Sequence, residues 1–134
     1  GSLLAELGGL KARISEQLTA RSPLERYEDV DPELRDRWET ELAAATEAEY
    51  RRQRGERLAC LQWWLRDVWI LAQRIVGQSL AYPELEAESG VVAGRVSPQD
   101  AMENLRVLER TQWLLGSNVQ EALALEVGLL KLKL

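Results

Sequence analysis

The sequence predicts an all-α fold, a helical bundle of about five to six helices. Ala, Leu, Glu, Arg and Gln, which are strong helix formers, dominate the 134 residues. Strand signals are nearly missing, because Phe is absent and β-branched residues never alternate with polar ones over several positions. The length fits one domain, so we expect residues 1–134 to form a single helical domain.

A first helix is predicted from Leu3 to Ala20. Apolar residues recur in this segment at spacings of three and four, which places them in one stripe along a helix. The dipeptide Ser22-Pro23 ends the helix, since a residue that precedes proline is disfavoured in the α region. The stripe predicts that one face of this helix is buried against a neighbour.

A second helix begins at Asp31-Pro32, where an acidic cap precedes a proline in the first turn. Nothing in the sequence forbids helix from there to Gly77. Two interpretations remain open, a single long helix or two helices with a break near Gly55. Residues 58–76 are apolar on nearly all sides, which predicts that they are covered on more than one side.

Three shorter helices complete the prediction. A weak one spans Ala81 to Arg95, and a stronger one runs from the Ser97 cap to Leu115. We expect Gly116 to end that helix in the left-handed conformation. Residues 118–121 resemble a capping box, with Asn118 as the cap, so we predict a last helix over 119–132 at the centre of the bundle.

The absence of histidine excludes several classes of enzyme. A Ser-His-Asp triad, a Cys-His pair and a histidine-ligated metal are all impossible. The single cysteine, Cys60, excludes an internal disulfide and a thiolate zinc cluster, and we expect it to be buried. There is no P-loop. We therefore predict no catalytic residue, no cofactor and no metal site in this chain.

The charge balance argues against nucleic acid as a partner. With 17 basic and 22 acidic residues the net charge is −5, which disfavours binding through the whole surface. The densest basic cluster, Arg51 to Arg57, could contact phosphates. We interpret it instead as a solvated helix face, because Glu47 and Glu49 lie at helical ion-pair spacing from it.

Tryptophan is frequent, with five in the chain, and three of them are concentrated in one segment. Trp63, Trp64 and Trp69 lie within two helical turns, either as core residues or as part of an interaction surface. Arg66-Asp67 interrupts the same apolar helix. Because charges there are costly unless paired, we expect a buried or interfacial salt bridge.

Two stretches resemble a known family. In residues 108–126 a helix with a late Leu-Leu leads to an Asn-Val turn and a Leu-Ala-Leu-Glu helix, followed by an apolar tail. Residues 63–71 form a Trp-rich helix that contains Arg66-Asp67. In sequence and order these stretches resemble the C-terminal collar domain of the delta-prime subunit of the bacterial DNA polymerase III clamp loader. The gamma/tau collar is the nearest alternative, and the Leu-Ala-Leu-Glu ending favours delta-prime.

The resemblance implies a collar-like fold and a structural role in DNA replication. Collar domains of five subunits pack into a ring that holds the AAA+ modules while they load the sliding clamp onto primed DNA. The AAA+ module and lid would lie upstream, with ATP hydrolysis in those modules, and Gly1-Ser2 would be a cloning remnant. The expected partners are the gamma/tau and delta subunits, without nucleic acid, membrane or small-molecule ligand. The motif or interface candidates are Trp63, Trp64, Arg66, Asp67, Trp69, Trp113, Asn118, Leu123, Leu125 and Glu126.

A stand-alone helical adaptor is the alternative function from a different class. It would use the same surplus of Trp and Leu for binding without an AAA+ parent. No segment reaches the ~18 uncharged apolar residues needed to span a bilayer. Together with the single cysteine, this leads us to expect a cytoplasmic protein.

Overall fold

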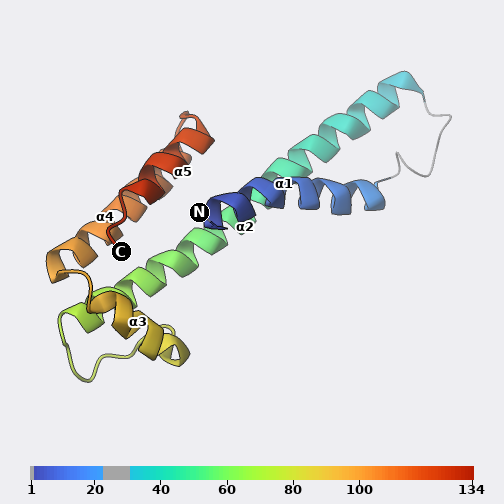
Figure 1. The fold of residues 1–134 in the computed structure, drawn as a ribbon. Helices are drawn as coiled ribbons and strands as arrows, with labels where there is room; N and C mark the ends of the chain where they lie inside the picture. The colour runs from blue at the N-terminus through green and yellow to red at the C-terminus, as the bar shows by residue number, and fades with distance from the viewer. Residues whose placement is uncertain (1, 23–30) are drawn as a thin grey trace. The chain divides into compact units, whose positions relative to one another are not determined.

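The computed structural model describes residues 2–22 and 31–134 and is all-α over these residues, as predicted. Five α-helices and one short 3-10 helix form this part of the chain, without a β-strand (Figure 1). They are α1 (Ser2–Arg21), α2 (Pro32–Ala72), η2 (Pro83–Leu85), α3 (Glu86–Ala93), α4 (Pro98–Leu115) and α5 (Glu121–Leu130). Gly1 and the predicted helix stop at Pro23 lie outside the described residues.

The chain divides into two compact units, residues 1–56 (unit 1) and residues 57–134 (unit 2). Each unit is described by itself. The boundary falls inside α2, which continues through it as one 41-residue helix. Of the two interpretations left open by the sequence, the single long helix is therefore correct. Gly55 lies within this helix with no neighbouring atom near its missing side chain. The single domain expected from the length stays a prediction.

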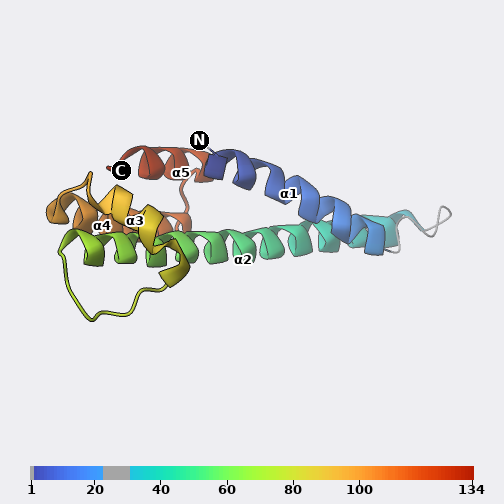
Figure 2. The ribbon, with the colours of Figure 1, turned by 60° about the horizontal axis from the view of Figure 1, so that its bottom comes forward.

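Unit 1 is a hairpin of two antiparallel helices, α1 and the first part of α2 (Figure 2). The predicted stripe of α1 is buried through Leu7, Leu10 and Ile14. On α2, Asp31 caps the first turn, because its carboxylate accepts the Glu33 backbone N–H at 3.3 Å. These observations confirm the first helix and the start of the second.

Unit 2 contains the remainder of α2 together with α3, α4 and α5. Trp64 links α2 to α3, since its indole N–H donates to the buried Ser89 hydroxyl at 3.0 Å. α4 begins at the predicted cap, where the Ser97 hydroxyl accepts the Asp100 backbone N–H at 3.0 Å. α4 and α5 pack side by side as an antiparallel pair (Figures 1 and 2).

The end of α2 shows why the helix stops before Gly77. Arg74 takes the left-handed conformation with φ of 55°, and its N–H donates to the Leu71 carbonyl. The Ile75 N–H donates to the Ile70 carbonyl, five residues back. This pair of hydrogen bonds is the Schellman pattern, which satisfies the last carbonyls of a helix. Nothing in the sequence predicted that Arg74, a non-glycine residue, would take this left-handed position.

The prediction for the C-terminal helix was partly wrong. Gly116 ends α4 in the right-handed region, with φ of −82° and ψ of −6°. The cap of the last helix is Gln120 and not Asn118, because α5 starts at Glu121, and Gln120 makes no side-chain cap hydrogen bond. α5 has 10 residues and exposes several large apolar side chains, so it is not the central helix of a bundle.

Candidate interaction surfaces

The expected Arg66–Asp67 ion pair is present and forms part of a loop anchor. The Asp67 carboxylate is fully buried and accepts the backbone N–H groups of Ala81 at 2.8 Å and Tyr82 at 2.9 Å. Arg66 lies 3.7 Å from the same carboxylate and 3.4 Å from the Ser79 carbonyl. A buried carboxylate with two backbone donors and a guanidinium 3.7 Å away is well compensated, so Asp67 fixes the return of the chain after α2.

An aromatic groove of about 370 Å³ lies between α2 and α4 in unit 2. Trp63 is 54% exposed at this groove, with the Arg66 guanidinium 5.6 Å from its ring centroid, a cation–π distance. The indole N–H of Trp69 is buried with no hydrogen-bond partner among the described residues. The groove is lined by Gln62, Trp63, Arg66, Trp69, Leu105 and Glu109.

Trp113 extends this aromatic surface along α4. It lies eight residues after Leu105 and four after Glu109, which places all three on one helix face. Its side chain is 67% exposed. Of the five tryptophans, Trp38, Trp64 and Trp69 are half-buried, whereas Trp63 and Trp113 are exposed.

An apolar stripe follows the exposed face of α5. Leu123, Val127 and Leu130 recur at spacings of four and three and are 56%, 42% and 75% exposed. The buried side of the helix contains Leu125 and Gly128. Large apolar side chains that gather on a surface often mark a place where another protein binds.

The opposite side of α5 packs against α4 at very short range. A Cβ placed on Gly128 would overlap the Thr111 hydroxyl and lie 2.8 Å from its methyl carbon. The adjoining tail is held by Asn104, whose amide exchanges two hydrogen bonds with the Lys133 backbone, at 2.8 and 2.9 Å. Lys133 also pairs with Asp100 at 3.2 Å.

A second groove, of about 220 Å³, runs between α4 and α5. Its basic residues are Arg106, Arg110 and Lys131, and its one acidic residue is Glu103, which lies 3.7 Å from Arg106. Arg110 and Lys131 form no ion pair with any residue that the structure describes. The apolar and small residues of the groove are Val107, Thr111, Leu114, Ala124, Val127 and Gly128.

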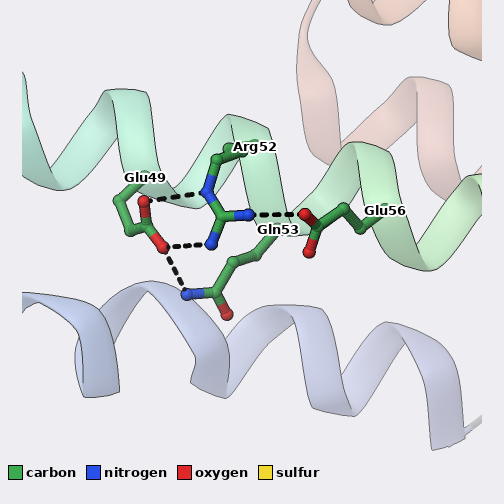
Figure 3. Close-up of polar contacts among 4 residues, drawn as sticks. All are labelled: Glu49, Arg52, Gln53 and Glu56. Carbon is green, nitrogen blue, oxygen red and sulfur yellow. Dashed lines mark hydrogen bonds and ion pairs between the residues drawn. The ribbon is translucent and has the colours of Figure 1, made fainter.

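The basic cluster of α2 is a helix face with internal ion pairs, as interpreted from the sequence. Arg52 bridges Glu49, at 2.7 Å, and Glu56 (Figure 3). Hydrogen bonds from Arg52 and then Gln53 lower the pKa of Glu49 to about 2. Glu47 binds Lys11 of α1, and that hydrogen bond is the main cause that lowers its pKa. Within this cluster, intrahelical carboxylates thus pair Arg51, through Glu47, and Arg52.

The prediction for Cys60 was wrong, because this cysteine is exposed. Cys60 lies two residues after Leu58, about 200° around the helix from the face that buries Leu58 and Leu65. The Tyr82 hydroxyl donates to the Cys60 carbonyl at 3.4 Å. A hydrogen bond with the Cys60 side chain, followed by burial, raises the pKa of Tyr82.

Two kinds of feature are absent from the described residues. They contain no group of three or more His, Cys, Asp or Glu side chains placed to hold a metal ion. None of their helices has both the length and the apolar character needed to cross a membrane.

The residues named from the sequence thus lie in different environments. Trp63, Trp113 and Leu123 are exposed large side chains, and Glu126 and Asn118 are exposed polar ones. Asp67 and Leu125 are buried. Sequence reasoning did not find Asn104, Thr111 or Gly128, although a glycine inside an apolar helix is a signal of close packing.

Comparison with known proteins gave no match to a protein-family model, to a curated protein or to a solved structure. The clamp-loader resemblance therefore depends on the two stretches of sequence alone.

Proposed function

We propose that this chain is a protein–protein interaction domain that holds its parent protein in an oligomeric assembly. The observation that carries the proposal is the exposed apolar stripe of α5, formed by Leu123, Val127 and Leu130. Exposed Trp63 and Trp113 support it, because tryptophan is enriched among the residues that dominate binding energy at interfaces. The apolar stripe would lose water contact when a partner covers it, which favours association.

The assembly that we propose is a clamp loader, with this chain as the collar domain of a delta-prime-like subunit. Support comes from the sequence resemblance of residues 63–71 and 108–126. Leu123 lies in the Leu-Ala-Leu-Glu segment of that resemblance, and the segment belongs to the helix that carries the exposed stripe. In this proposal the chain contributes binding surface, and ATP hydrolysis belongs to other modules.

Light scattering of the chain, alone and mixed with gamma/tau and delta collar domains, tests the proposal. We expect a mixed complex that the Leu123→Glu/Leu130→Glu variant no longer forms. The matched control is Val76→Glu/Val91→Glu, which places charges on exposed apolar residues outside α5. If the chain binds neither collar domain, the clamp-loader assignment is contradicted. A complex that survives the α5 variant contradicts the role of the stripe.

A further inference from the structure

We propose that the groove between α4 and α5 binds an amphipathic helix of a partner protein, with Asp or Glu side chains beside its apolar stripe. This inference rests on the proposed interaction function and names the chemistry of the partner. Two features of the groove lead to it, the apolar surface at and beside the groove and the charge of its borders.

The apolar surface requires an occupant with its own apolar stripe. Val107 and Leu114 of α4 and Val127 of α5 line the groove, and Val127 belongs also to the exposed stripe with Leu123 and Leu130. The stripe spans eight residues, and the seven steps from Leu123 to Leu130 cover about 10 Å at 1.5 Å per residue. Two turns of a helix match that length, and anchors at i, i+4 and i+7 are the usual way in which a helix binds a groove.

The charged residues at the borders of the groove determine which charge a binding partner should carry. Arg106 and Arg110 of α4 and Lys131 of α5 contribute three positive charges against the single carboxylate of Glu103. The whole chain has a net charge of −5, so this groove is basic on an acidic protein. Arg110 and Lys131 make no ion pair within the part of the chain that the structure describes. Carboxylates on a partner would complement them, which steers encounter and suppresses partners of the wrong sign.

Nucleic acid fits the groove less well than an acidic helix. Its lining contains no aromatic side chain on which a base could stack, and its hydrophobic positions would remain uncovered under a phosphate backbone. The groove therefore favours a partner that supplies apolar side chains and carboxylates together.

Two synthetic peptides test the sign of the partner against the full 134-residue chain. Each is an 18-residue amphipathic helix with Leu at heptad positions, flanked by Glu in one peptide and by Lys in the other. Fluorescence anisotropy of the labelled peptides should show the Glu peptide binding on the order of tenfold more tightly at low salt. The difference should shrink in 0.5 M NaCl, because salt screens exposed charges.

A charge-reversal variant locates the site. Arg110→Glu/Lys131→Glu should invert the preference, so that the Lys peptide binds more tightly than the Glu peptide. The matched control is Arg37→Glu/Arg95→Glu, which reverses two exposed arginines outside the groove and should keep the original preference. Far-UV circular dichroism verifies that both variants retain their helices.

The outcomes separate this inference from the proposed function. Equal binding of both peptides, binding of neither, or a preference that the reversal leaves unchanged overturns the acidic-helix partner. If the chain still forms its complex with collar domains in that case, the proposed function survives without this inference. If the chain prefers the Glu peptide as expected but forms no complex with collar domains, the clamp-loader assignment is contradicted. The inference that the groove binds an acidic helix is then retained.

Discussion

The buried carboxylate of Asp67 accepts the backbone N–H of Tyr82, fifteen residues later in the chain, at 2.9 Å. The neighbouring N–H of Ala81 binds the other carboxylate oxygen. One side chain near the end of α2 thereby determines where the chain returns after this helix. The same arrangement explains how a charge can be buried there, because both oxygens have hydrogen-bond donors and Arg66 lies beside them.

The first prediction concerns this anchor. Asp67→Asn retains one carbonyl acceptor but turns an NH2 group toward a backbone N–H, so one buried donor loses its partner. We expect the free energy of unfolding to fall by about 1–3 kcal/mol, measured by urea denaturation with circular dichroism at 222 nm. Asp36→Asn is the matched control, since Asp36 is exposed and should change stability little. Equal losses in the two variants would contradict the anchor.

A second prediction concerns the close approach of α4 and α5. Gly128→Ala places a methyl group against the buried Thr111 side chain, so the two helices must separate or Thr111 must move. Overpacking of this kind typically costs about 1–3 kcal/mol. The expected result is a lower urea midpoint.

A matched glycine substitution and a compensating variant test the cause. Gly55→Ala meets no neighbouring atom inside helix α2 and should stabilise the chain by about 0.5–1 kcal/mol, because alanine is the better helix former. Combining Gly128→Ala with Thr111→Ala removes the clashing hydroxyl and methyl groups and should restore part of the lost stability. If Gly128→Ala is as harmless as Gly55→Ala, the close approach is not tight in solution.

Local signals in the sequence predicted the parts of the fold that depend on local interactions. The stripe of α1 and the Ser97 cap of α4 both follow from residues a few positions apart. The pairing of Asn104 with Lys133 could not be predicted in this way, because 29 residues separate them and the contact exists only after α4 and the tail meet. The apolar composition of α5 suggested burial on all sides, but burial depends on how many neighbours a helix has.

The sequence predicted which residue types form the candidate interaction surfaces, but not where these residues lie in the fold. The surplus of Trp indicated an interaction surface, but the sequence could not say that Trp63 is exposed whereas Trp64 binds Ser89. The basic groove was not foreseen, since Arg110 and Lys131 lie 21 residues apart and meet only when α4 and α5 pack. Exposed apolar residues and unpaired charges become meaningful only after their neighbours are known.

The last prediction concerns acid. The pKa of Glu49 is lowered from its ordinary value of 4.5 to about 2, first by hydrogen bonds from Arg52 and then by Gln53. A lowered pKa means that folding favours the ionised carboxylate, so its contribution to stability is present above pH 4.5 and is lost as the pH falls toward 2. Glu49 is exposed to solvent screening, which keeps this contribution small.

Glu49→Gln removes the titrating carboxylate, so the stability of the variant should change less as the pH falls. We expect the shift in urea midpoint between pH 7 and pH 3 to be smaller in the variant than in the unmodified chain, with the variant less stable at pH 7. Glu39→Gln is the matched control, because Glu39 is exposed on the same helix and forms no ion pair with the residues described. Its acid response should match that of the unmodified chain. Identical pH dependence in both variants would mean that the Glu49–Arg52 pair does not persist in solution.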